Sequence, residues 1–142
     1  MSAETAGYSG TPLPKKLGIK EGSLVAVIGA PAGFDETLGE LPPAVEIRRQ
    51  ARGPLDLIVF FTTRRAELAR RFPIVARALA PAGGLWIAWP KKSSGVATDL
   101  VFLDVQAVGL AAGLVDNKVC AIDEVWSGVR FVIRLKDRLP GR

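Results

Sequence analysis

The sequence predicts an α/β fold with three layers, in which helices cover both faces of a mostly parallel sheet and a C-terminal antiparallel hairpin closes that sheet. Three stretches of strand length are apolar almost throughout, at 24–30, 55–61 and 84–89. Such continuous apolarity is typical of strands that are covered on both faces, as in a parallel sheet. Parallel strands need long crossovers, and a stretch with helical character follows each of the last two.

The first half of the chain holds shorter elements. A short helix is expected within 11–22, with Leu17 and Ile19 packed against the body of the protein. Residues 34–41 form a short helix at best, because two prolines follow them. Residues 44–49 alternate apolar and polar side chains, which predicts a strand near the edge of the sheet.

A long helix is predicted after the second buried strand. Its apolar stripe consists of Leu68, Phe72, Val75 and Leu79. Spacings of three and four residues place these side chains on one helix face. Pro73 should kink or split this helix, because proline cannot donate a hydrogen bond to the carbonyl one turn earlier. Pro81, Gly83 and Gly84 are expected to end it.

The last elements are a second helix and the final hairpin. Thr98 and Asp99 suit the start of a helix that runs to about Ala112, because a hydroxyl can cap it and a carboxylate favours its positive end. Ser127 and Gly128 lie between two strand-like segments, which predicts the turn of a hairpin at these residues.

Length and composition limit what the protein can be. Its 142 residues suit one domain, expected over 11–138 between flexible tails at 1–10 and 139–142. No stretch has the roughly 18 uninterrupted apolar residues of a membrane span, and the first residues lack the features of a secretory signal. The single cysteine, Cys120, excludes an intrachain disulfide, so a cytoplasmic location is expected.

The sequence contains no histidine. This absence excludes Ser-His-Asp triads, Cys-His pairs and histidine-ligated metal sites, and we identify no catalytic residue and no metal ligand. The net charge of +5 favours anionic partners. Nucleic acid is not the expected partner, because the basic residues are spread over the whole chain and only 7% of residues are aromatic.

The segments LDLIVFF, ALAPAGGLWIAWP and AGLAAGLVD, followed by a terminal hairpin, resemble the back half of the S-adenosylmethionine (SAM)-dependent methyltransferase fold. The resemblance covers residues 55–136 at the level of pattern. It implies a Rossmann-like domain whose cofactor lies over the loop after the first strand.

The whole chain also resembles a family of short bacterial proteins that is classed only as a domain of unknown function. GYSGTPLPKKLGIKEG, WPKKSSG and AGLVDNKVCAIDEVWSGVRFVIRLKDR carry this resemblance. It brings no activity that could be transferred to this chain.

The loop after the first buried strand, IGAPAGF, stands where methyltransferases have a Gly-x-Gly-x-Gly-like turn. The candidate cofactor-binding residues are Gly29, Ala30, Pro31 and Gly33. Pro31 departs from the family pattern, because it removes a backbone N–H donor and fixes φ in a turn that must approach its ligand closely.

Two further departures concern the walls of the cofactor pocket. The second strand ends in Arg48, Arg49 and Gln50, where the methyltransferase family has an acidic residue for the ribose hydroxyls. Only residues 49–55 then lead to the next strand, where a full methyltransferase has a helix, a strand and another helix. The resemblance therefore implies a reduced pocket.

Basic and hydroxyl side chains follow the second and third buried strands. They are Arg64, Arg65, Lys91, Lys92, Ser93 and Ser94. Because the loops beyond the carboxyl ends of parallel strands meet at one edge, these residues could form a rim that binds a phosphate or a carboxylate. The simpler alternative is that they are exposed loop residues.

Other polar and aromatic residues are interpreted structurally. Asp56 is expected at the opposite edge of the sheet, and Cys120 as a packed thiol. Trp86 and Trp89 are expected in the core, with stacking of a base or an adenine on Trp89 as the alternative.

Two hypotheses about function follow. The first is a non-catalytic, methyltransferase-like module without a cofactor, which binds an anionic small molecule or a macromolecular partner. The second is a small SAM-dependent methyltransferase with a reduced cofactor pocket, since methyl transfer needs mainly positioning and a cofactor. The identity of the ligand, any protein partner and the oligomeric state stay open at this point.

Overall fold

The structure, a computed structural model, describes residues 10–138. Nearly all of the two predicted tails, residues 1–9 and 139–142, lies outside the described residues. The strands are β1 (Leu24–Ile28), β2 (Glu46–Arg48), β3 (Leu55–Phe61), β4 (Leu79–Pro90), β5 (Leu114–Ala121) and β6 (Trp126–Ile133). The helices are α1 (Leu13–Leu17), α2 (Phe34–Leu38), α3 (Arg65–Ala76) and α4 (Phe102–Ala111), with 3-10 turns η1 (Lys92–Ser94) and η2 (Leu135–Asp137).

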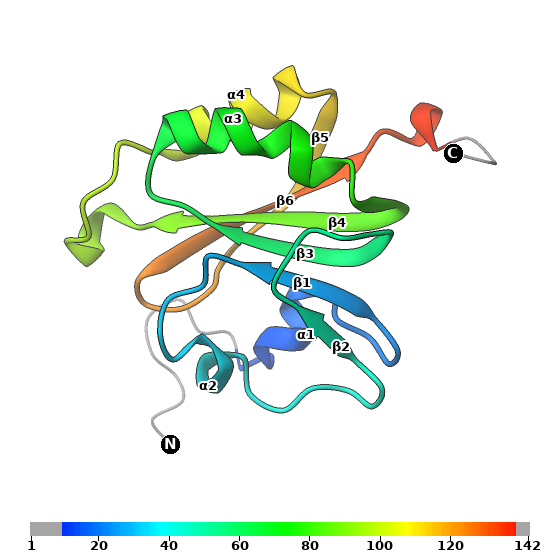
Figure 1. Cartoon of the computed structure of the whole chain (residues 1–142). Coiled ribbons are helices and arrows are strands. Elements are labelled where there is room, and N and C mark those ends of the chain that lie inside the picture. Colours follow the sequence, from blue (N-terminus) through cyan, green and yellow to red (C-terminus); the bar gives the residue numbers. More distant parts are fainter. Residues whose placement is uncertain (1–9, 139–142) are drawn as a thin grey trace.

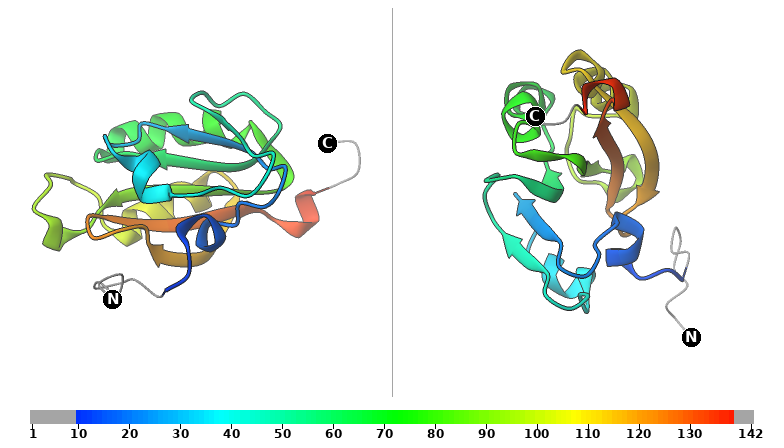
Figure 2. Two further views of the ribbon diagram at one scale, coloured as in Figure 1. Left: turned by 90° about the horizontal axis from the view of Figure 1, so that it is seen from below. Right: turned by 90° about the vertical axis from the view of Figure 1, so that its right-hand side faces the viewer.

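The strands form one six-stranded sheet in the order β2-β1-β3-β4-β6-β5. The strands β2, β1, β3 and β4 are parallel to one another, whereas β6 runs antiparallel to both β4 and β5. Figure 1 shows α3 and α4 on one side of this sheet and α1 and α2 on the other, and the end-on view in Figure 2 separates the layers. The predicted three-layer α/β fold with a mostly parallel sheet and an antiparallel hairpin is confirmed.

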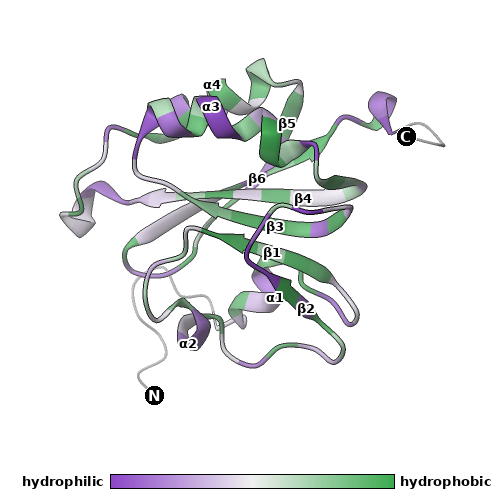
Figure 3. Ribbon diagram, in the orientation of Figure 1, coloured by the Kyte–Doolittle hydropathy of each residue, from purple (hydrophilic) through white to green (hydrophobic). Residues whose placement is uncertain are grey.

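Each face of the sheet has its own apolar core, because side chains alternate between the two faces along a strand. Under α3 and α4 the core includes Ile58, Phe60, Leu68, Phe72 and Phe131. Under α1 and α2 it includes Leu17, Val25, Phe34, Phe61 and Trp86. Figure 3 shows the apolar residues concentrated in the central strands, as expected for strands buried on both faces.

The front half of the chain follows the prediction. α1 buries Leu17, and Ile19 just beyond it is also buried. β2 lies at the edge of the sheet, and the segment 49–54 leads from it past β1 to β3 without a helix. The shortened connection inferred from the sequence is therefore present.

The helix α3 differs from the prediction in its continuity and its end. It runs unbroken through Pro73 and ends at Ala76, and Leu79 belongs to β4. Ala69 and Pro73 are both exposed, so water can hydrate the Ala69 carbonyl that proline leaves without a donor. Phe72 and Val75 on either side of the proline are buried and hold the helix against the sheet.

The residues expected to end that helix lie inside β4 instead. Gly83 and Gly84 are buried strand residues, and a Cβ atom at Gly83 would lie 2.8 Å from the Leu55 carbonyl oxygen. These glycines therefore reflect close strand packing and not a helix stop.

The turn of the hairpin also differs from the prediction. The connection is 122–125, and Ser127 and Gly128 lie within β6, where they pair with Trp89 and Ala88 of β4. The Asp123 carboxylate accepts hydrogen bonds of 2.8 Å from the amides of residues 125 and 126, which closes the turn. A Cβ atom at Gly128 would lie 3.1 Å from the Trp86 ring, so this glycine serves packing.

Candidate functional site

The carboxyl ends of β1, β3 and β4 lie at one edge of the sheet, at the left of Figure 1. The loops that leave this edge are 29–33, 62–64 and 91–95. In open α/β sheets, ligands bind beyond such ends. The residues predicted as a cofactor loop and as an anion rim thus come from the three loops of this carboxyl edge.

Gly29 is required by the fold itself. Its φ is 71°, in the left-handed region, and a Cβ atom there would lie 2.9 Å from the Phe61 carbonyl oxygen. Both facts favour glycine whether or not a ligand binds. Gly33, with a φ of 86°, occupies the position before the first residue of α2.

The rest of this loop lines a shallow hollow of about 430 Å³. Ala30, Pro31 and Arg49 are among the residues that line it. The amide of Phe34 donates to the Pro31 carbonyl at 3.2 Å, so the loop turns back on itself before the single helical turn of α2.

The arginines after β2 are paired with carboxylates. The Arg49 guanidinium lies 3.3 Å from the Asp35 carboxylate, and the Arg48 guanidinium lies 2.9 Å from that of Glu46. A guanidinium therefore occupies the end of β2, where the resemblance implied an acidic residue. Asp35, on α2, is already bonded to this arginine.

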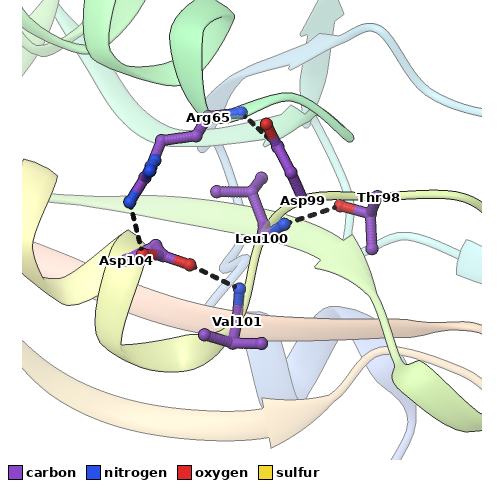
Figure 4. Close-up of polar contacts among 6 residues, drawn as sticks. All are labelled: Arg65, Thr98, Asp99, Leu100, Val101 and Asp104. Carbon is purple, nitrogen blue, oxygen red and sulfur yellow. Dashed lines mark hydrogen bonds and ion pairs between the residues drawn. The ribbon is translucent and has the colours of Figure 1, made fainter.

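Arg64 and Arg65 lie at the start of α3 and have different surroundings. Arg64 is exposed and extended, just before the helix. The Arg65 guanidinium is 2.9 Å from the Asp104 carboxylate, and its backbone amide donates to the Asp99 carboxylate at 2.7 Å (Figure 4). Two carboxylates thus lie beside the predicted rim and lower its positive charge.

The start of the last helix, α4, differs from the prediction. α4 begins at Phe102 and not at Thr98, and Asp104 accepts a hydrogen bond of 3.1 Å from the Val101 amide (Figure 4). The Thr98 hydroxyl donates to the Thr63 carbonyl at 2.7 Å. The segment 98–100 therefore fastens the start of α3, and Asp99 satisfies an amide of α3 and not of α4.

Lys91, Lys92, Ser93 and Ser94 form η1 and the residue before it. The Lys91 amide donates to the Val125 carbonyl at 2.7 Å, and the Ser94 hydroxyl donates to the Lys91 carbonyl at 2.7 Å. Lys92 and Ser93 are exposed. Among residues 10–138, no hydrogen bond or ion pair joins this loop to Arg64 or Arg65, so a shared anion at the rim stays a prediction.

Three residues behave as the structural interpretation expected. The Asp56 carboxylate accepts a hydrogen bond of 2.8 Å from the Leu24 amide, at the edge where β1 and β3 begin. Trp86 is fully buried and its indole N–H donates to the Leu17 carbonyl at 2.9 Å. Trp89 is only 6% exposed, which leaves no open ring face for a base.

Cys120 is half-buried on β5. Burial raises the pKa of its thiol, and the positive charges of Lys16 and Lys118 oppose this effect in part. The thiol is therefore protonated near neutral pH, which agrees with a packing role.

Two larger hollows lie on the side of the sheet that α1 and α2 cover, and sequence reasoning missed both. One, of about 1000 Å³, lies between α1, residues 37–42 and the turn 121–125. The other, of about 590 Å³, lies where β1, β3 and β4 begin. It is lined by residues 15–18 and 20–23, by the starts of β3 and β4, and by Asn117, Lys118 and Arg130. We call the second one the amino-edge pocket.

Residues 10–138 contain no group of three or more acidic, cysteine or histidine side chains that could hold a metal ion. Within the same residues, no helix is long and apolar enough to cross a membrane.

No family model and no curated protein matches the chain. Solved structures match its fold. A SAM-dependent methyltransferase from Aquifex aeolicus superposes with a TM-score of 0.59 at 20% identity, over 84% of this chain and 87% of that one. Precorrin-6y C5,15-methyltransferase from Geobacter metallireducens gives a TM-score of 0.61 at 9% identity, over 86% of each chain.

A third match is magnesium protoporphyrin IX methyltransferase from Synechocystis with bound S-adenosylhomocysteine (SAH), with a TM-score of 0.53 at 11% identity, over 80% of this chain and 75% of that one. Identities of 20% and below show the fold alone. The chain therefore has a methyltransferase-like Rossmann fold, as the resemblance implied.

Proposed function

We propose that this protein is a binding module with a methyltransferase-like fold that does not itself transfer methyl groups, and that its ligand is an anion. The observation that carries the first part is the guanidinium of Arg49 at the end of β2, bonded to Asp35 at 3.3 Å. A ribose diol is bound by a carboxylate that accepts from its hydroxyls, and a guanidinium has no acceptor atom.

The loop after β1 supports the same conclusion. Pro31 lacks an amide donor at the point where a nucleotide-like cofactor would approach the backbone. α2 has only five residues, and the hollow beside it is shallow and open to Asp35 and Glu36. The proline therefore leaves this loop with one backbone N–H donor fewer for a nucleotide-like cofactor.

The proposed anionic ligand rests on the distribution of charge. The chain has a net charge of +5, and the amino-edge pocket gathers four lysines and an arginine. At the carboxyl edge, the rim of Arg64, Arg65, Lys91 and Lys92 remains the second place for an anion. A macromolecular ligand with an acidic surface would meet the same side chains.

A second candidate, a small SAM-dependent methyltransferase, is favoured by one observation. Two solved methyltransferases match over 84–86% of this chain and over 86–87% of their own length. Proteins that are named methyltransferases can therefore be nearly as short as this chain. In this case the cofactor would lie over Gly29, Ala30, Pro31 and Gly33. When bound, SAM would supply the methyl group, and the loop residues would only position it.

Calorimetric titration of the protein with SAM and with SAH separates the two candidates. We expect no saturable heat with either molecule up to about 1 mM, the concentration at which a binding free energy of roughly −4 kcal/mol would be detected. Saturable binding of either molecule by the wild-type protein would overturn the non-catalytic proposal.

A variant makes the same test more sensitive. Arg49→Glu restores an acidic residue at the end of β2, and the exposed position tolerates it. If the guanidinium is what excludes the ribose, this variant alone should gain affinity. Equal binding of SAM by Arg49→Glu and the wild type would show that the Arg49 guanidinium does not exclude the ribose.

A further inference from the structure

We propose that the amino-edge pocket binds a small molecule that carries a phosphate group. This inference deepens the anion-binding part of the proposed function, and it does not depend on whether the carboxyl edge binds SAM. The pocket, of about 590 Å³, falls in the range of roughly 300–1,000 Å³ that is typical of small-molecule sites.

The pocket is strongly basic. The basic residues that line it are Lys15, Lys16, Lys20, Lys118 and Arg130, of which Lys16 directs its ammonium to the Ala121 carbonyl, outside this lining. The carboxylates that line it are Glu21 and Asp56, so positive charge remains in excess. Asp56 is already bonded to the Leu24 amide, which leaves Glu21 as the carboxylate without such a bond.

Within residues 10–138, none of these five basic side chains forms an ion pair. The four ion pairs found in residues 10–138 all involve arginines at other positions. A cluster of like charges without counter-charges is unfavourable, and an anion bound among them removes that cost. At the carboxyl edge the cations are partly neutralised, because Arg49 and Arg65 have carboxylate partners there. Arg64, Lys91 and Lys92, in contrast, form no ion pair within residues 10–138.

Arg130 is the most specific member of the cluster. It lies in β6, half-buried, and burial together with the nearby charge of Arg138 lowers the pKa of its guanidinium. Its hydrogen-bond partner is the neutral Asn117 side chain, at 3.4 Å. The other N–H groups of this planar fork are available to pair with two oxygens of one phosphate.

Gly84 shapes the place in which that guanidinium lies. A Cβ atom at Gly84 would overlap the guanidinium of Arg130, which therefore rests directly on the backbone of β4. A glycine in the middle of a buried strand lowers the stability of that strand, and here it leaves the space that the guanidinium occupies. We call this guanidinium and the β4 backbone beneath it the floor of the pocket.

Two lysines form a wall with limited freedom. The Lys16 ammonium donates to the Ala121 carbonyl at 2.9 Å, and the Lys118 ammonium donates to the Lys16 carbonyl at 3.0 Å. Carbonyl partners are neutral, so both charges remain. These bonds also stabilise the end of α1, which would explain Lys16 and Lys118 without any ligand.

Such a helix-stabilising role does not account for the rest of the cluster. Lys15 and Lys20 are exposed, and among the described residues their ammonium groups have no hydrogen-bond or ion-pair partner. Both line the same pocket as the half-buried Arg130. A phosphate dianion held between these lysines and Arg130 would accept hydrogen bonds from both.

The test is calorimetric titration with pyrophosphate and with inorganic phosphate at constant ionic strength. We expect saturable binding of pyrophosphate by the wild-type protein and weaker binding of phosphate. Lys15→Gln/Lys20→Gln should weaken pyrophosphate binding about tenfold, because it removes two solvent-exposed charge pairs, each of modest strength. Arg130→Gln should weaken it further.

The matched control is Arg70→Gln/Arg77→Gln, on and just after α3, which removes two exposed positive charges on the other face of the sheet and should leave the affinity unchanged. A loss of affinity in Lys91→Gln/Lys92→Gln but not in Lys15→Gln/Lys20→Gln would overturn the proposal and favour the rim. Absence of saturable pyrophosphate binding by the wild type would also overturn it, as would binding of a short DNA oligonucleotide in its place.

Two precautions keep the outcome unambiguous. If Arg130→Gln fails to fold, the exposed lysine pair still decides the question, because neither side chain is packed. Binding of SAM by the wild type would contradict the proposed non-catalytic role and leave the pyrophosphate result standing. Pyrophosphate and SAM should then bind together without competition, since the two sites lie at opposite edges.

Discussion

The two edges of the sheet carry similar numbers of basic side chains, but these side chains have different hydrogen-bond and ion-pair partners. At the carboxyl edge, Arg49 and Arg65 each lie within 3.3 Å of a carboxylate. At the amino edge, the partners of Lys16, Lys118 and Arg130 are carbonyl and amide oxygens. A count of charges therefore does not locate an anion site; what matters is which cations lack a counter-charge.

Substitution of Gly29 should have the largest effect. It tests whether this residue of the carboxyl edge is needed for the stability of the fold. Gly29→Ala should lower the free energy of unfolding by about 1–3 kcal/mol, because it combines a positive φ with a contact to the Phe61 carbonyl. Urea denaturation measures this loss. Gly95→Ala is the control, since Gly95 has a φ of 78° and open space around it. Equal losses would mean that the contact with β3 is unimportant.

Asp99 tests the carboxylates beside the predicted rim. Asp99→Ala removes the acceptor of the Arg65 amide and should cost about 1 kcal/mol of stability, the usual effect of losing a helix-capping side chain. Asp99→Asn keeps an acceptor oxygen and should recover most of the loss. Faster hydrogen exchange at the Arg65 amide in the alanine variant alone is the sharper readout. Unchanged exchange would argue against this bond.

Gly84 tests the floor of the amino-edge pocket. Gly84→Ala should change stability by less than about 1 kcal/mol, because the long Arg130 side chain can move aside. The same change should abolish the contribution of Arg130 to pyrophosphate binding. In the Arg130→Gln background, Gly84→Ala should then have no further effect on affinity. An additive loss would show that the two residues act separately.

The smallest effect is expected at Arg49. Arg49→Ala breaks an exposed ion pair with Asp35 and should change stability by less than about 0.5 kcal/mol, as is usual for such pairs. It should leave pyrophosphate binding unchanged, in contrast to Arg130→Gln. A clear loss of pyrophosphate affinity would erase the difference between the two edges.

Much of the fold follows from the sequence, because buried parallel strands have a clear signature. The continuous apolar runs around Val27, Val59 and Ile87 identified the three central strands, and the edge position of β2 followed from its alternation. The hairpin was recognised, but Ser127 and Gly128 pointed to the wrong turn. The glycine there serves packing against Trp86, which no local pattern reveals.

One of the two candidate sites could be predicted from the sequence, and the other could not. The loops of the carboxyl edge could be predicted, since each directly follows a recognisable strand. The carboxylates of Asp99 and Asp104 could not be assigned to Arg65, because they lie 34 and 39 residues away from it. The amino-edge pocket was missed for the same reason: Lys20, Lys118 and Arg130 come from distant segments that only the folded sheet brings together.

The hydrogen bond from the Trp86 indole to the Leu17 carbonyl places a natural fluorophore at the junction of α1 and the sheet. Lys15 and Lys16 belong to the same helix, and Lys20 follows it closely, so one wall of the amino-edge pocket is fastened through this bond. Loosening of α1 would expose the indole to water and move its emission to longer wavelengths. The intrinsic fluorescence of the protein, to which Trp89 and Trp126 also contribute, thus includes a signal from Trp86 that follows the state of that wall.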